Sequence, residues 1–233
     1  MNTTDHGHTP ARASGGRGNY DLVIALFCAL LLISNIGATK LIAFGPDVTL
    51  GRYPLLPVIT DGGAFLFPLT YVFGDVLAEV YGFARARRAI LLGFGCSILA
   101  SAVFLAVDHA PPAPGFENQD AWHAVLGFVP RIVVASLAAY LAGQFLNAHV
   151  LVWIKRRTSE RLLWARLIGS TVVGELADTS IFCLVAWGGL IGAGTMVNYI
   201  LTGYVYKVLV EVVLLPLTYR VIALIKRHEP DYA

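Results

Sequence analysis

The sequence predicts an all-α membrane protein with six transmembrane helices and both termini in the cytoplasm. The first observation behind this prediction is composition: 57% of the 233 residues are hydrophobic, 14% are charged, and the mean hydropathy is +0.68. An ordinary soluble domain is about a quarter charged. The composition therefore argues against a soluble enzyme, a disordered protein and a nucleic-acid-binding protein. The other two observations are the apolar segments and the placement of the basic residues.

Six apolar segments are long enough to cross a bilayer, which takes roughly 20 residues of helix. They cover residues 22–44, 62–83, 89–107, 132–154, 168–190 and 197–225. Pro68 and Pro216 lie inside the second and the sixth segment, where we expect a kink or a broken helix. The polar composition of residues 1–19 predicts a disordered cytoplasmic tail. Residues 20–228 are predicted to form the transmembrane domain, and residues 229–233 a short C-terminal tail.

The basic residues fix the orientation of these segments. Thirteen of the 17 Lys and Arg residues lie within residues 1–19, 84–88, 155–166 and 220–227, which share one side of the membrane if every segment crosses it. The connections on the other side hold few basic residues. Because basic connections stay in the cytoplasm, both termini are predicted to lie inside the cell.

The sequence gives no sign of a disulfide framework, a metal site or a cofactor. Its three cysteines, Cys28, Cys96 and Cys183, lie in apolar runs and form no CxxC pair. Such cysteines are typical of small buried hydrophobic residues.

Seven ionisable residues lie inside the predicted membrane segments, where each charge is costly and is usually functional. Asp75 and Glu79 are four residues apart, as are Lys207 and Glu211, while Glu175 and Asp178 are three apart, so each pair shares one helix face. Phe67 and Tyr71 extend the Asp75–Glu79 face. We expect the three faces to meet around a polar cavity. The seven residues are Lys40, Asp75, Glu79, Glu175, Asp178, Lys207 and Glu211.

A purely structural role is the alternative for these charges. Lys207 would then pair with Asp178 or Asp75, and Glu79 with Arg85 or Arg88. Five acids face two lysines in this set, so some acids must be protonated, bind a cation, face water or meet a donor-rich ligand.

The fourth segment adds amide groups and a small-residue face. Gln144 and Asn147 lie toward its cytoplasmic end, and Ala135, Ala139 and Gly143 recur at four-residue spacing. Small residues at this spacing allow close helix contact. The face serves either packing within the chain or a homodimer.

A cavity with carboxylates, amines, amides and aromatic rings suits a flat, polar, donor-rich small molecule. Carboxylates accept hydrogen bonds from N–H groups, Asn, Gln and Lys donate, and Phe or Tyr stack on a ring. A nucleobase-like ligand fits this set better than an anion or a sugar.

Several motifs carry a resemblance to a known family. They are Ser34-Asn35-Ile36 with Lys40, Phe67-Pro68-Leu69-Thr70-Tyr71 with Asp75, Glu79-Val80-Tyr81-Gly82, Leu163-Trp164-Ala165-Arg166, Gly174-Glu175 and Asp178-Thr179. With these motifs the chain resembles the bacterial queuosine precursor transporter family, also called the vitamin-uptake-like transporter family. Gly74, beside Asp75, is a departure from the family pattern, because we expect a residue with less backbone freedom there.

The resemblance implies a fold similar to the substrate-binding subunits of energy-coupling-factor transporters, in the bacterial inner membrane. It also implies import of 7-deazaguanines, such as 7-cyano-7-deazaguanine, for transfer RNA modification. The partners expected are this small molecule, the lipid bilayer and a second copy in a homodimer, with no nucleic acid. The substrate-binding residues expected are Asn35, Lys40, Phe67, Tyr71, Asp75, Glu79, Gln144, Glu175, Asp178, Lys207 and Glu211.

The roles that we infer divide these residues by chemistry. Asp178 and Asp75 accept from the N–H edge of the base, Lys207 or Asn35 donates to its carbonyl, and Phe67 or Tyr71 stacks on the ring. Glu175 or Glu211 carries a proton that couples transport.

Two other functions remain open from the sequence. The chain could capture a purine-like or vitamin ligand for a separate ATPase module, because it has no Walker motif of its own. An intramembrane aspartyl protease would use Asp75 and Asp178, but the expected glycine two residues before Gly74 is Val72, and a Tyr-Asp motif is missing from the preceding segment.

Overall fold

The computed structural model describes residues 19–50, 53–158 and 163–228, so nearly all of the two predicted tails lies outside the described residues. Each predicted apolar segment overlaps a helix in these ranges. A short helix, α4 (Gln119–Val125), follows α3 and was not predicted. The six longer helices are α1 (Tyr20–Gly37), α2 (Phe67–Tyr81), α3 (Phe83–Asp108), α5 (Val129–Thr158), α6 (Leu163–Trp187) and α7 (Ala193–His228).

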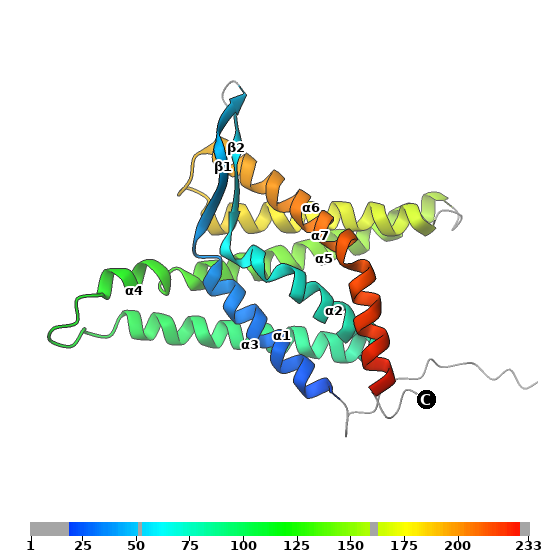
Figure 1. Cartoon of the computed structure of the whole chain (residues 1–233), viewed down its shortest axis with the longest axis horizontal. Coiled ribbons are helices and arrows are strands. Elements are labelled where there is room, and N and C mark those ends of the chain that lie inside the picture. Colours follow the sequence, from blue (N-terminus) through cyan, green and yellow to red (C-terminus); the bar gives the residue numbers. More distant parts are fainter. Residues whose placement is uncertain (1–18, 51–52, 159–162, 229–233) are drawn as a thin grey trace, which may run out of the picture.

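The contacts between these six helices form a closed ring, and α2 also packs on α3. Figure 1 shows the helices from the side. In order around the ring, α1 packs on α3, α3 on α5, α5 on α6, α6 on α7, α7 on α2, and α2 back on α1. The contact between α5 and α6 is the most extensive among the described elements. A ring of this kind encloses an interior that side chains from every helix can reach.

The prediction of an all-α protein is wrong at residues 41–61, which form a hairpin. β1 (Leu41–Leu50) and β2 (Tyr53–Asp61) pair antiparallel, with Leu41 opposite Asp61. The first helix therefore ends at Gly37 and not at residue 44. A Cβ on Gly62 would lie 2.5 Å from the carbonyl oxygen of Gly37, so the chain returns through a contact that only glycine allows. In Figure 1 the hairpin stands beside α7, against which β2 packs.

The two expected proline kinks have different outcomes. The second apolar segment begins as a 3-10 helix, η1 (Gly62–Phe65), and α2 starts only at Phe67. Pro68 thus lies in the first turn of α2, where its missing N–H needs no partner, and the kink expected there is wrong. Pro216 lies inside α7, where it removes a helical hydrogen bond, and Figure 1 shows α7 changing direction along its length.

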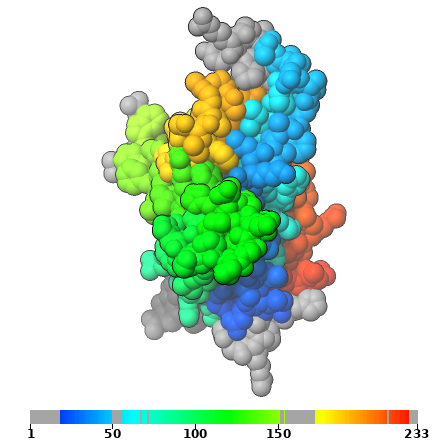
Figure 2. Space-filling model, turned by 90° about the vertical axis from the view of Figure 1, so that its left-hand side faces the viewer, coloured from blue at the N-terminus to red at the C-terminus, as the bar shows by residue number. Residues whose placement is uncertain are grey.

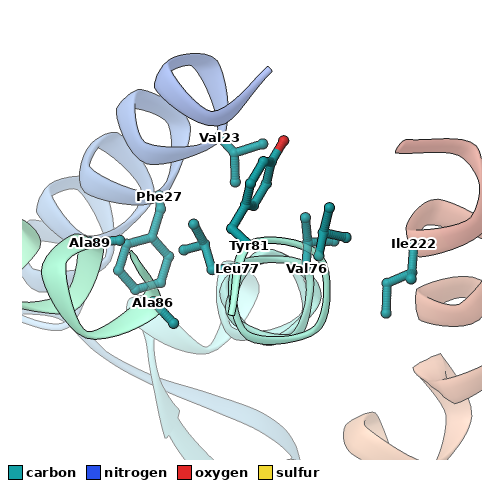
Figure 3. Packing of buried hydrophobic residues seen from close by; sticks show 9 residues of the cluster. Val23, Phe27, Val76, Leu77, Tyr81, Ala86, Ala89 and Ile222 are labelled. Atoms are coloured by element: carbon teal, nitrogen blue, oxygen red, sulfur yellow. The ribbon is translucent and has the colours of Figure 1, made fainter. Parts of the chain in front are cut away.

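Hydrophobic clusters fill the interior of the ring at both of its ends. We call the end where α1 begins and α7 ends the termini end, and the end that holds the hairpin and residues 188–192 the hairpin end. At the termini end, α1, α2, α3 and α7 point side chains toward one another (Figure 3). This cluster consists of Val23, Phe27, Val76, Leu77, Val80, Tyr81, Ala86, Ala89 and Ile222.

The hairpin end has two smaller clusters, one of which packs β1 and β2 on α6 and α7. Figure 2 looks at this end, with the segment that contains α4 in front and the hairpin above it to the right. The clusters consist of Ala38, Ile132, Ala135 and Ala186, and of Cys183, Met196 and Tyr199. The polar residues of α1, α5, α6 and α7 lie between the two ends.

Four helical stretches in the described part of the chain are long and apolar enough to cross a membrane. They are Tyr20–Gly37, Phe83–Asp108, Gln119–Val150 and Ala193–Leu214. Many large apolar side chains on these stretches are exposed, among them Leu99, Leu141 and Val213. In water such a surface would be unfavourable, whereas lipid is its natural environment.

Candidate functional site

The polar centre of the ring is built around Lys207 of α7. This residue is 7% exposed, and its ammonium donates a hydrogen bond to the carboxylate of Asp178 on α6. Glu175, one turn earlier on α6, has a carboxylate oxygen 3.8 Å from Lys207 Nζ. The prediction that Glu175 and Asp178 share one helix face is confirmed. A buried ammonium needs such partners, since an unpaired buried charge is strongly destabilising.

Two glycines allow α6 to carry Asp178 close to α5. A Cβ on Gly143 would lie 3.0 Å from Asp178 Cβ, and a Cβ on Gly174 would lie 2.9 Å from Asn147 Cβ. Ala135 packs beside Ala186 of α6 at the hairpin end of the same contact. The small-residue face of the fourth segment is therefore used for packing within the chain.

Two adjoining cavities flank the pair of Lys207 and Asp178. The hairpin-side cavity has a volume of about 150 Å³ and reaches toward the hairpin. The termini-side cavity has a volume of about 250 Å³ and reaches toward the termini end. Both are lined by Leu31, Tyr140, Asp178 and Lys207, so the ion pair lies where they meet.

Asn35 of α1, one of the expected substrate-binding residues, lies in the wall of the hairpin-side cavity. Its amide nitrogen donates to Ser97 Oγ of α3 at 3.2 Å, and its amide oxygen accepts from Ser136 Oγ of α5 at 3.2 Å. These bonds join three helices and hold the amide at the cavity wall.

Aromatic rings also line the hairpin-side cavity. Phe94 and Tyr140 have ring centroids 5.3 Å apart at an interplanar angle of 57°, and Phe182 lies in the same wall. The side chains of Phe67 and Tyr71, the predicted stacking residues, lie outside the described part of the structure.

Asp61 is a site residue that the sequence reasoning missed. It is 4% exposed, lines the hairpin-side cavity, and accepts hydrogen bonds from the Tyr199 hydroxyl at 2.5 Å and from Gly63 N at 2.7 Å. The residue precedes the second apolar segment, so a search of the segments alone does not include it. The signal that could have found it is a carboxylate followed by Gly62-Gly63 at a segment boundary.

The termini-side cavity holds carboxylates and amides besides Lys207. Glu175, Asn147 and Gln144 line it, and the Oδ1 atom of Asn147 is buried without a hydrogen-bond partner. Gln144 is exposed, so it marks the mouth of this cavity.

Four predicted site residues do not line either cavity as described. Lys40 and Asp75 are exposed, and Glu79 is 61% exposed with an ion pair to Lys226 at 3.0 Å. The partner shown for Glu79 is thus Lys226 of α7, whereas the structural alternative named Arg85 or Arg88. The apolar residues of α2, including Val76 and Val80, are buried; this rotation of the helix leaves Asp75 and Glu79 exposed. Glu211, half-buried on α7, is close enough to Glu175 and Asp75 for mutual repulsion.

The chain is similar in sequence to known bacterial transporters. It is 35% identical to the probable queuosine precursor transporter of Bacillus subtilis (strain 168) over 168 residues, which cover 72% of this chain and 73% of that protein. It is 30% identical to the queuosine precursor transporter of Escherichia coli (strain K12) over 157 residues, 66% of this chain and 68% of that protein. No solved structure matches the chain.

A family model of membrane transporters also matches the chain. The model described as a putative vitamin uptake transporter matches residues 61–221. The matched stretch begins at Asp61 and includes Asp178 and Lys207, so it contains the charged centre of both cavities. The chain belongs to the putative vitamin uptake transporter family.

Proposed function

We propose that this protein imports 7-deazaguanine precursors of queuosine, such as 7-cyano-7-deazaguanine, for transfer RNA modification. One observation carries the proposal: relatives named queuosine precursor transporters match about two thirds or more of a chain whose helices surround two adjoining cavities with carboxylates, an ammonium, amides and aromatic rings. A guanine-like base is flat and rich in N–H donors, so this set of groups suits it.

The base ring occupies the hairpin-side cavity in this proposal. Asp178 and Asp61 accept hydrogen bonds from its N–H edge, and Lys207 or Asn35 donates to its carbonyl. Asp61 takes the part expected of Asp75, because Asp61 lines the cavity. Tyr140 and Phe182, which line the same cavity, supply the faces for stacking.

The membrane arrangement is a further part of the proposal. The chain crosses the bacterial inner membrane six times, with both termini in the cytoplasm, as in the substrate-binding subunits of energy-coupling-factor transporters. Two features support it: the six helices lie at the predicted segments, and the basic residues gather on one side. Under this arrangement the termini end faces the cytoplasm.

The chain is a multi-pass membrane transporter and not an enzyme, since its family and its relatives are transporters. The aspartyl protease alternative also needs two aspartates that act together. Asp178 is paired with Lys207, and Asp75 does not line either of the cavities that flank this pair.

The test is uptake of labelled 7-cyano-7-deazaguanine by cells that cannot synthesise it, with queuosine in their transfer RNA as the readout. Cells with the protein are expected to recover queuosine, whereas Asp178→Asn and Asp61→Asn variants that reach the membrane are not. Glu117→Gln, a carboxylate change in the exposed loop before α4, is the matched control and keeps uptake. No recovery with the folded wild-type protein in the membrane would contradict the proposal.

The energy source is tested separately. Uptake by liposomes that contain this protein alone would exclude a required ATPase module. Proton coupling through Glu175 or Glu211 remains a prediction, and it is contradicted if Glu175→Gln and Glu211→Gln both leave uptake fully responsive to pH.

A further inference from the structure

A narrow pocket lies beside the hairpin-side cavity, where β2, α6 and α7 meet. We call it the side pocket. Its volume is about 20 Å³, which leaves room for one water or for one group of similar size. Asp61, Phe182 and Lys207 line both the side pocket and the hairpin-side cavity. A ring in the hairpin-side cavity can therefore place one small substituent in the side pocket.

The hydroxyl of Thr179 on α6 lines the side pocket without a partner among the described residues. Thr179 is 3% exposed, and its Oγ1 atom is buried and makes no hydrogen bond. A helical hydroxyl can bond to the carbonyl one turn earlier, as Ser180 does with Leu176 at 2.7 Å. Because buried polar groups normally have partners, the Thr179 hydroxyl points to a bound group that supplies a hydrogen bond.

The other polar groups at the side pocket favour a guest that donates. Asp61 accepts hydrogen bonds from the Tyr199 hydroxyl and from Gly63 N, and each oxygen of a carboxylate can accept a second one. The hydroxyl of Tyr206, which also lines the pocket, is already donated to the carbonyl oxygen of Ala64 at 2.9 Å. An N–H group in the pocket would therefore find acceptors in both the carboxylate and the threonine hydroxyl.

We propose that the side pocket binds the exocyclic amino group of the base, between the Asp61 carboxylate and Thr179 Oγ1. The inference rests on the proposed function, and it makes Thr179 a residue that selects rings with an amino group beside the ring N–H. The two donors of an amino group match these two acceptors. In a guanine-like ring the carbonyl lies at the other end of the same edge, and Lys207, which lines both spaces, is a donor suited to it.

The side pocket selects by hydrogen bonding and by size. A ring with hydrogen in place of the amino group leaves both acceptors unsatisfied, which costs affinity. A methyl group on the amino nitrogen meets close walls, since a Cβ on Gly203 of α7 would lie 3.2 Å from Thr179 Cγ2. Overpacking of such a space is unfavourable, whereas Thr179→Ala removes Cγ2 and makes room for the methyl group.

The test is the affinity of the purified full-length protein, in detergent, for three compounds that differ only at this amino group. They are 7-cyano-7-deazaguanine, its analogue with hydrogen in place of the amino group, and its analogue with a methylamino group, measured by calorimetry. We expect 7-cyano-7-deazaguanine to bind at least about tenfold more tightly than either analogue.

Variants then assign the preference to Thr179. Thr179→Val keeps the shape of the side chain and removes the hydroxyl, so the preference for the amino group over hydrogen should fall by about threefold or more. Its melting temperature should equal that of the wild type or exceed it, because the hydroxyl lacks a partner within the described chain. Ser180→Ala removes a neighbouring hydroxyl that lines none of the three spaces, so this matched control keeps the preference. Thr179→Ala should improve binding of the methylamino compound relative to 7-cyano-7-deazaguanine.

The outcomes separate this inference from the proposed function. Equal affinities of the wild type for 7-cyano-7-deazaguanine and the analogue without the amino group would overturn the inference and leave the proposed function standing. The same holds if Thr179→Val keeps the full preference, or if Thr179→Ala brings no gain for the methylamino compound. Failure of the folded wild type to bind any of the three compounds would overturn both.

Discussion

At the scale of single residues, the buried pair of Lys207 and Asp178 predicts an unequal response to single and double substitution. Lys207→Met leaves two carboxylates of α6 without their ammonium, which should cost about 3 kcal/mol of stability. Lys207→Met combined with Asp178→Asn removes the orphaned charge of Asp178, so the double variant should melt at a higher temperature than Lys207→Met alone. Thermal unfolding in detergent measures both. Additive losses of stability would mean that the two side chains do not interact.

Asp61 and Tyr199 give a second prediction at this scale, with a control on the same helix. Tyr199→Phe removes a hydrogen bond to a carboxylate, and such bonds contribute about 1.5–3 kcal/mol. Tyr206→Phe removes a bond to the neutral carbonyl oxygen of Ala64, which contributes about 0.5–1.5 kcal/mol. We expect Tyr199→Phe to lower the melting temperature more than Tyr206→Phe. The reverse order would indicate that Asp61 does not depend on the Tyr199 hydroxyl.

The sequence located part of the charged centre because bilayer physics makes charges in apolar segments conspicuous. Helical spacing then placed Glu175 and Asp178 on one face, as the structure has them. Asp61 is buried by tertiary packing of the hairpin. The hydropathy of a segment gives no information on such packing. Asp75 lines neither cavity because the buried apolar residues of α2 decide how that helix rotates. The spacing of its acids carries no information on that rotation.

At the scale of elements, the contact of α5 with α6 predicts which glycines are sensitive. Gly174→Ala would put a Cβ 2.9 Å from Asn147 Cβ and 3.1 Å from the carbonyl oxygen of Gly143. The helices must then separate, and overpacking of this kind costs about 1–3 kcal/mol.

Gly95→Ala in α3 is the matched control, because a Cβ there meets nothing within 4 Å. Alanine favours a helix by up to about 1 kcal/mol over glycine, so this variant should melt at the same temperature as wild type or higher. Equal effects of Gly174→Ala and Gly95→Ala in thermal unfolding would contradict the close approach of α5 and α6.

The hairpin shows why elements in a membrane protein are harder to predict than segments. Residues 41–44 continue the apolar run of α1, and a short apolar stretch has the same hydropathy as strand or as helix. Asn198 of α7 accepts from Ile59 N at 3.0 Å and donates to the Pro57 carbonyl at 3.2 Å. These two hydrogen bonds help to hold β2 against α7. They connect residues about 140 positions apart in the sequence, and local sequence patterns do not reveal contacts of this kind.

At the scale of the whole molecule, the closed ring of helices joins features that the sequence could give only separately. Composition predicted a membrane protein, apolar runs predicted its helices, and charge spacing predicted a polar interior. The order of helices around the ring depends on close contacts such as Gly143 with Gly174. That order brings α5, α6 and α7 together, and with them the termini-side cavity. The packing of the helices thus determines where a cavity lies, whereas the types of polar group that line it can be predicted from the sequence.

The proposed orientation makes a prediction for opposite ends of α3. This helix has 26 residues, or about 39 Å at about 1.5 Å per residue, enough to cross a hydrocarbon core of about 30 Å. Arg87 near its beginning and Glu117 in the loop after it are both exposed.

In a chain whose own cysteines are replaced by alanine, Glu117→Cys should react with a membrane-impermeant maleimide applied outside spheroplasts. Arg87→Cys should react only after the membrane is permeabilised, since the basic connection stays in the cytoplasm. The opposite pattern would invert the topology, and with it the side from which substrate enters. Labelling of both sites from outside would mean that α3 does not cross the membrane.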